Sequence, residues 1–187
     1  MKIALLLALT LLFPDFVSAE EPHLSVRAAF AEVPADLKIP ADPMDLAKQK
    51  GVDFVTLPAM TTALGEPAKF KLTSDFGEAP EGTPEVGVRL TVIPKRDGGK
   101  IHFVADFDLT EFSGFADSGD GAKDKKTPMF DVRQALGMRG DAEYGKAAVM
   151  TALTQTLRQM VQEQGKPDRL EVSQKKILVI LIFEKAE

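Results

Sequence analysis

Two stretches of strict alternation, joined by a short glycine-containing turn, constrain the fold of this chain more than anything else in its sequence. Apolar residues take every second position over Val86–Val92 and again over Ile101–Leu109. A period of two is typical of a β-strand with one buried face, because successive side chains point to opposite faces. The polar stretch between them, Pro94–Lys100, contains Asp-Gly-Gly and suits a tight turn. The sequence therefore predicts a β-hairpin.

Further strands are predicted before this hairpin. The segments with strand-like alternation are His23–Val33, Val52–Thr62 and Ala68–Leu72. Pro58 should break the second of these strands, since proline has no amide hydrogen to donate. Ahead of that strand, Asp42 or Asp45 could cap a helical turn or two that Gly51 would end.

The last third of the chain has a different pattern. Apolar residues recur at steps of three and four at Met150, Leu153, Leu157 and Met160, with Val149 and Val161 beside them. This spacing predicts one long amphipathic helix over residues 141–164, ended by Gly165 and Pro167. The uninterrupted apolar run Ile177–Phe183 predicts a last strand over residues 175–184, covered on both faces and central in a sheet.

The first residues of the sequence have the composition of a targeting segment. Lys2 precedes an apolar run that is too short to span a bilayer comfortably, and Val17-Ser18-Ala19 supplies small residues for a signal peptidase. We expect a secretory signal peptide over residues 1–19, cleaved after Ala19. The alternative is an uncleaved anchor helix. No cysteine follows the run, so lipidation at that point is excluded.

Composition limits the remaining 20–187 to one domain without covalent cross-links. The formal net charge is −5, and it stays −5 without residues 1–19, which hold one Lys and one Asp. Nucleic acid is therefore not an expected partner. The absence of cysteine excludes disulfides and thiolate metal sites. We expect a first strand and connection over 20–50, a β core over 51–135, and then the helix and last strand.

Residues suited to catalysis are few. The chain has two histidines, His23 near the start of residues 20–187 and His102, and His102 shares a strand face with Asp106, two alternations away. A metal or acid–base site there would need a partner from another strand, and a solvated strand face is the simpler interpretation. We predict no catalytic, cofactor-binding or metal-binding residues, and no cofactor.

Three other groups of residues are candidate sites. Asp117, Asp120 and Asp124 share one loop but lack the spacing of an EF-hand, so a solvated loop is favoured over a Ca²⁺ site. Arg139-Gly140-Asp141 is a tripeptide that some cell-surface receptors recognise, yet it suits the start of the predicted helix. The Met150–Met160 stripe is interpreted as core contact rather than a partner groove.

The order of these segments resembles the C-terminal homology domain of the bacterial secretins, in a truncated and divergent form. The matching pieces are LSVRAAFAEV (Leu24–Val33), KQKGVDFVTLPAMTTALGEPAKFKL (Lys48–Leu72), EVGVRLTVIPKRDGGKIHF (Glu85–Phe103), FDLTEFSGF (Phe107–Phe115), TPMFDVR (Thr127–Arg133) and KKILVILIF (Lys175–Phe183). The resemblance covers about two thirds of residues 20–187 as an ordered series of short motifs.

The resemblance implies a mainly β (α+β) fold: an antiparallel sheet or sandwich, with the long helix placed before a final buried strand. Secretins are outer-membrane ring proteins of type II and type III secretion and type IV pilus systems. The implied function is a non-enzymatic exported envelope protein, a component or accessory of such an export apparatus, in the periplasm or at the outer membrane. Its partners would be other envelope proteins, or copies of itself. A stand-alone module that binds a protein, glycan or small ligand is the alternative, and a small hydrolase ranks last.

Overall fold

The computed structural model describes residues 23–74, 83–117, 126–161 and 169–186. The elements in chain order are β1 (His23–Pro34), the short 3₁₀ helix η1 (Pro43–Lys48), β2 (Asp53–Thr56), β3 (Met60–Ala63), β4 (Ala68–Ser74), β5 (Val86–Asp97), β6 (Lys100–Asp117), β7 (Lys126–Ala142), β8 (Ala147–Val161) and β9 (Arg169–Lys185). The fold is mainly β, as predicted.

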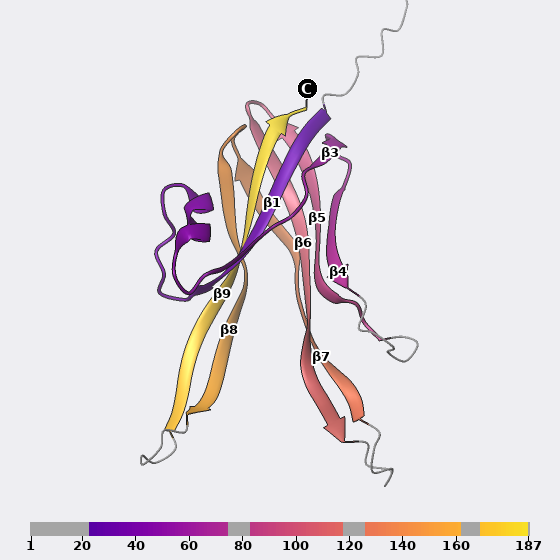
Figure 1. The fold of residues 1–187 in the computed structure, drawn as a ribbon. Coiled ribbons are helices and arrows are strands. Elements are labelled where there is room, and N and C mark those ends of the chain that lie inside the picture. Colours follow the sequence, from indigo (N-terminus) through magenta and orange to yellow (C-terminus); the bar gives the residue numbers. More distant parts are fainter. Residues whose placement is uncertain (1–22, 75–82, 118–125, 162–168, 187) are drawn as a thin grey trace, which may run out of the picture.

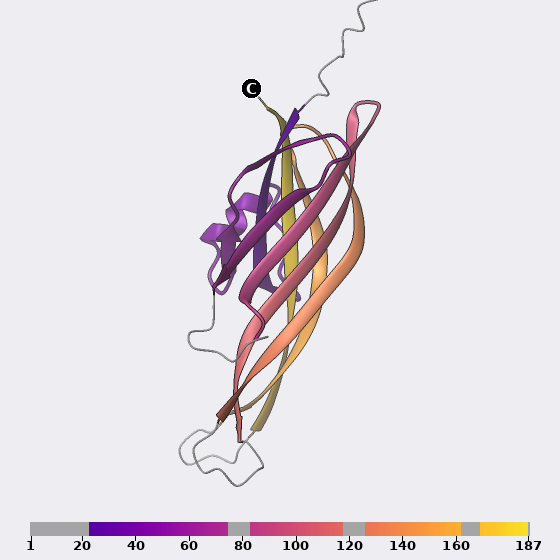
Figure 2. The ribbon, with the colours of Figure 1, turned by 90° about the vertical axis from the view of Figure 1, so that its right-hand side faces the viewer.

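Two antiparallel sheets pack face to face as a sandwich (Figures 1 and 2). The five-stranded sheet A has the order β2-β1-β9-β8, with β3 also paired to β1, and the four-stranded sheet B has the order β4-β5-β6-β7. β9 pairs with β1 along one edge and with β8 along the other. Its residues Ile177–Phe183 are all buried, which confirms the prediction of a central last strand.

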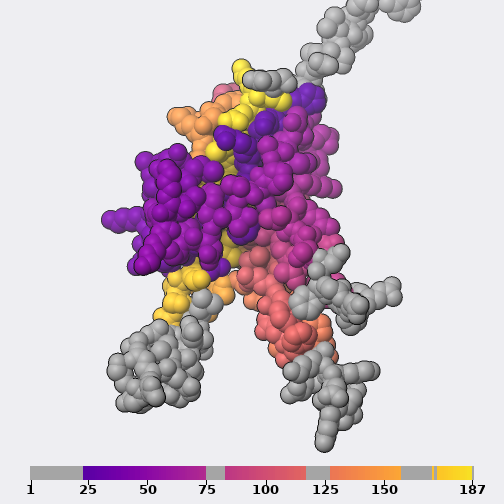
Figure 3. Space-filling model, viewed as in Figure 1, coloured from indigo at the N-terminus to yellow at the C-terminus, as the bar shows by residue number. Residues whose placement is uncertain are grey.

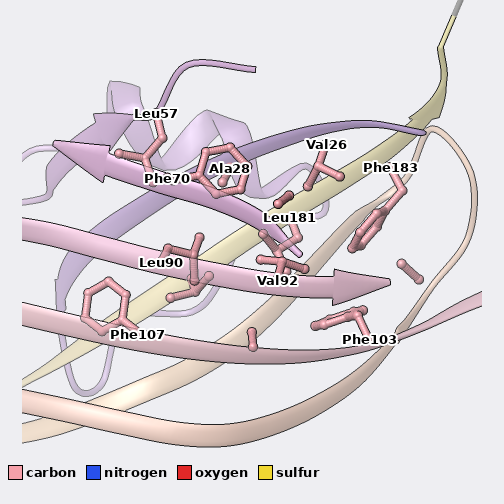
Figure 4. Packing of buried hydrophobic residues seen from close by; sticks show 14 of the residues in the cluster. Val26, Ala28, Leu57, Phe70, Leu90, Val92, Phe103, Phe107, Leu181 and Phe183 are labelled. Atoms are coloured by element: carbon pink, nitrogen blue, oxygen red, sulfur yellow. The ribbon is translucent and has the colours of Figure 1, made fainter. Parts of the chain in front are cut away.

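The main core fills the space between the two sheets (Figure 4). Sheet B contributes the alternating apolar residues of β5 and β6, and sheet A contributes one face of β1 and β9. Phe103 of β6 and Phe183 of β9 are in ring contact, with centroids 5.3 Å apart. A smaller cluster lies on the opposite face of sheet A, where η1 places Leu46 against Leu178 and Ile180. Burial on both faces explains the uninterrupted apolar run of β9.

Two glycines are required by the geometry of sheet B. Gly98 lies between β5 and β6 with φ +60°, a conformation that side chains disfavour, so it permits the predicted hairpin turn. Gly140 of β7 pairs with Phe103 across the sheet. A Cβ at Gly140 would lie 2.6 Å from Cζ of Phe103, so the ring occupies the space that a side chain would need.

The first part of the chain follows its sequence pattern closely. Asp42 caps η1 by accepting a hydrogen bond from the amide of Met44 at 2.9 Å. The strand predicted over Val52–Thr62 is divided into β2 and β3, and Pro58 lies in the break. Both pieces pair with β1, because its edge is long enough to take one after the other.

The long helix predicted over residues 141–164 is wrong: this stretch is the end of β7, a turn and β8. Met150 and Leu153 both contact the main core although they are three residues apart, which is a helical spacing. A register shift between Thr151 and Leu153 inserts one extra residue into β8, and this bulge converts a strand spacing of two into three. The Arg139-Gly140-Asp141 tripeptide accordingly lies inside β7 and does not begin a helix.

The hairpins β6–β7 and β8–β9 continue beyond the sandwich and diverge from each other (Figure 1). We call these extensions the β6–β7 leg (residues 111–117 with 126–132) and the β8–β9 leg (residues 157–161 with 169–173). In the space-filling view the two legs stand apart below the sandwich (Figure 3).

Candidate interaction surface

Within the described residues, each leg is a two-stranded ribbon whose strands pair only with each other. The pairing of β5 with β6 ends at Gly87 and Thr110, so no described strand pairs with β6 on that side along the leg. The pairing of β1 with β9 ends at Pro34 and Lys175, and the same holds for β9. Unpaired strand edges present rows of amide and carbonyl groups that can pair with another chain.

At the base of the β6–β7 leg, the apolar and charged side chains exchange faces relative to the sandwich above it. Leu109 is buried in the main core and pairs with Arg133, so Arg133 is on the core-facing side of the sheet. Glu111 and Asp131, the next pair on that side, are also charged. The pair between them on the opposite face is Thr110 and Val132. Directly below Leu109 the inner face therefore carries charged residues, and Met129 follows them on the same side.

Apolar side chains cover the outer face of this leg instead. The rings of Phe112 and Phe130 pair across the strands with centroids 6.0 Å apart, and Phe112 contacts Phe115 at 5.0 Å. Val132 follows on the same face and is 53% exposed. Exposed apolar residues that are contiguous in this way commonly mark protein or membrane contacts.

The β8–β9 leg repeats this inversion at the same level of the sandwich. Ile177 is buried in the main core, but Lys175, two residues below on the same face, forms an ion pair with Glu32 of β1. Val172 and Leu170 point to the other face and are 57% and 56% exposed. Both legs thus carry exposed apolar residues on the face that continues the outer side of the sandwich.

A single arginine links the two legs where the apolar core ends. Arg133 forms an ion pair with Glu111 of its partner strand and lies 3.0 Å from Asp131, measured from Nε to Oδ2. Its Nη1 also donates to Oε1 of Gln155 on β8. The Arg133 side chain is only 17% exposed, and its ion pairs offset part of the cost of burying its charge, although the buried Nε has no hydrogen-bond partner among the described residues. This network closes the core and ties the legs together at their base.

Glu85, just ahead of β5, has a pKa lowered from 4.5 to about 2. The hydrogen bond from Lys71 is the largest cause, followed by those from Thr73 and Arg89. Lys71 belongs to β4 and Arg89 to β5, so the carboxylate joins neighbouring strands. A carboxyl held ionised in this way suits a structural ion-pair cluster rather than general acid catalysis.

The structure does not bring together the pair considered for catalysis. His102 contacts Asp141 through Nδ1 and lies 3.4 Å from Asp97 through Nε2, while Asp106 accepts a hydrogen bond from the amide of Gly137 at 2.7 Å. The described residues contain no cluster of three or more side chains that could hold a metal ion.

The other groups named from the sequence do not form a common site. Asp120 and Asp124 fall outside the described residues, and Asp117 ends β6. Met150 contacts the main core, in agreement with its interpretation as a core residue. The Met160 side chain is outside the described part of the structure. No helix in the described ranges is long and apolar enough to cross a membrane.

Sequence reasoning missed the inverted faces, although the sequence contains the evidence for them. Over Ile101–Leu109 of β6 the apolar residues have odd numbers, whereas further along the same strand Phe112 has an even number and the charged Glu111 takes an odd position. A change of phase inside one continuous strand predicts that its buried and exposed faces exchange.

Comparison with known proteins defines the class of fold. No family model and no curated protein matches the sequence. Among solved structures, ExeD of Aeromonas hydrophila superposes with a TM-score of 0.53 at 13% identity, covering 90% of this chain and 49% of that chain. The type II secretion system secretin GspD of E. coli K12 gives 0.53 at 11% identity, covering 89% and 51%. The ETEC pilotin–secretin complex AspS–GspD gives 0.52 at 13% identity, covering 89% and 50%.

The fold of this chain is therefore secretin-like, and the chain spans about half the length of these matched structures. The similarity covers about nine tenths of the chain. At these identities it defines the fold alone, and function has to be argued from the surface described above.

Proposed function

We propose that this chain is a non-enzymatic envelope protein, a component or accessory of a protein export apparatus of the type II secretion or type IV pilus kind. The exposed apolar residues on the outer faces of the two legs carry the proposal. A ribbon of two strands with such a face suits contact with another protein or with a membrane more than isolation in water. The secretin-like fold supports an envelope setting for that contact.

We further propose that the legs are the part through which it associates, either with copies of itself or with other envelope proteins. Export would follow from the signal peptide predicted over residues 1–19. N-terminal sequencing of the protein from a periplasmic or membrane fraction should find Glu20 first, and retention of Met1 would contradict cleavage.

Light scattering on residues 20–187, with and without mild detergent, tests association directly. We expect particles larger than one subunit, which the double variant Val132→Ser/Leu170→Ser converts to single subunits. Both positions are exposed on the legs at 53% and 56%, so the sandwich should stay folded.

The matched control is Ile39→Ser/Leu72→Ser, whose residues are exposed at 45% and 47% but lie off the legs. This control should leave the assembly unchanged. A single-subunit mass for the unaltered protein at every concentration, with no retention by envelope fractions, would refute association through the legs.

A further inference from the structure

An apolar hollow of about 120 Å³ lies on the outer face of sheet A, away from the legs, and two of its lining residues, Ala28 and Leu57, also belong to the main core. Two cross-strand pairs between β1 and β9 contribute to its lining, Arg27 with Ile182 and Ala29 with Ile180. Met44 of η1 and the connection between β2 and β3 complete the lining. The hollow is therefore built by several elements that the fold holds in place.

The small side chain of Ala29 creates this space. Ala29 is 2% exposed and lies between larger residues, and its methyl group leaves unfilled the volume that a longer side chain would occupy. Ile180 and Ile182 are also buried, at 1% and 7%. An engineered apolar cavity of about 150 Å³ stays dry and binds benzene, so a hollow of this size suits a single ring or a short branched chain.

A cationic side chain adjoins the apolar lining. Arg27 lines the hollow, and its side chain is 50% exposed. Among the described residues it is hydrogen-bonded to Glu184, with Nη2 2.7 Å from Oε1. A guanidinium has five N–H donors in a planar fork, so one carboxylate bonded at one nitrogen leaves donors for a second carboxylate.

We propose that this hollow binds a small branched or aromatic apolar group that carries a carboxylate. The apolar part fills the space above Ala29 and Ile180, and the carboxylate pairs with the Arg27 donors that Glu184 leaves available. This chemistry is shared by free short-chain or aryl carboxylic acids and by the C-terminal residue of a polypeptide that ends in Leu or Phe. The site lies off the legs and does not depend on their association.

Titration of ¹⁵N-labelled protein tests the proposal. The protein comprises residues 20–187 and carries Val132→Ser/Leu170→Ser, which prevents association through the legs. The probes are 3-methylbutanoate and phenylacetate, with 3-methylbutan-1-ol as the neutral comparison. We expect saturable amide shifts at Ala29, Ile180 and Ile182, with the acid tighter than the alcohol. Absence of saturable shifts there for both acids overturns the proposal. If the leg variant is unfolded, the same titration on the unaltered protein in detergent decides.

Charge variants test the role assigned to Arg27. Arg27→Gln should weaken binding of the acids about two- to fivefold, the range for an exposed ion pair, and leave the alcohol unchanged. Glu184→Gln removes the competing carboxylate and should tighten the acids. Arg96→Gln, at the turn between β5 and β6, is the matched control and should change nothing. Equal effects of Arg27→Gln on acid and alcohol would overturn the charge pairing.

Blocking the space and varying the ligand complete the test. Ala29→Leu fills the hollow and should abolish binding of acids and alcohol alike, and unchanged binding in a folded Ala29→Leu protein overturns the site. The peptide N-acetyl-Ala-Leu and its C-terminal amide distinguish the two sources of the carboxylate, a polypeptide C-terminus and a free carboxylic acid. Binding of the acid form alone supports a polypeptide C-terminus, while binding of the free acids without the peptide supports a small-molecule ligand.

Discussion

Gly140 offers a sharp test of how sheet B is packed, because a single methyl group there should be destabilising. A Cβ at position 140 would lie 2.6 Å from Cζ of Phe103 and 3.1 Å from both Cε atoms. Carbon atoms normally approach to roughly 3.5–4.0 Å, so the ring would have to move by about 1 Å. Phe103 is 3% exposed and packs against Phe183, so it has little room to move.

We therefore expect Gly140→Ala to lower the free energy of unfolding by about 1–3 kcal/mol, the usual cost of overpacking a core. Urea unfolding followed by circular dichroism measures this loss as a lower midpoint. Gly99→Ala is the matched control, since a Cβ at Gly99 meets nothing within 4 Å. Its free energy of unfolding should stay within about 0.5 kcal/mol of the unaltered protein.

A double-mutant cycle then attributes the loss to the ring. Leucine lacks the Cε and Cζ atoms that meet the new methyl group, so Gly140→Ala should cost at least about 1 kcal/mol less in a Phe103→Leu protein. Equal losses in the two backgrounds, or a loss no greater than for Gly99→Ala, would refute the reasoning.

Three further predictions follow from contacts described above. Phe107→Ala should cost about 3–5 kcal/mol in urea unfolding, because Phe107 is fully buried in the main core. Arg133→Met should lower the free energy of unfolding by about 1.5–3 kcal/mol, because hydrogen bonds to a charged group are lost. It should also speed amide hydrogen exchange in the β6–β7 leg, and unchanged exchange there would show that Arg133 does not hold the legs together. Because the pKa of Glu85 is lowered in the folded protein, the stability it contributes is present above pH 4.5 and is lost as pH falls toward about 2. Glu85→Gln should remove this part of the acid-unfolding profile, and an identical profile would contradict it.

Much of the sandwich could be predicted because its patterns are local. The alternation of Val86–Val92 and Ile101–Leu109 depends only on which face of each strand is buried, and both strands were correctly placed. The apolar run Ile177–Phe183 was also interpreted correctly, since burial on both faces removes alternation. These predictions needed no knowledge of distant contacts.

The errors arose where tertiary structure alters a local pattern. The bulge in β8 between Thr151 and Leu153 produced a spacing of three that the sequence alone could not distinguish from a helix. The hollow beside Ala29 and the link from Arg133 to Gln155 both join elements far apart in the chain, so no spacing indicated them. The partners of His102 were missed for the same reason, because Asp141 comes from β7.

The position of β9 has a consequence for how the chain can fold. β9 is the last described strand to be synthesised, yet it lies between β1 and β8 in sheet A. The hairpins pair residues that are close in the sequence. The pairing of β1 with β9 instead joins residues that are far apart, such as Arg27 and Glu184, which are separated by 157 positions. Contacts over such separations form late and slow folding. Until then the apolar edge of β1 is open to other chains, so aggregation during synthesis should begin at this first strand.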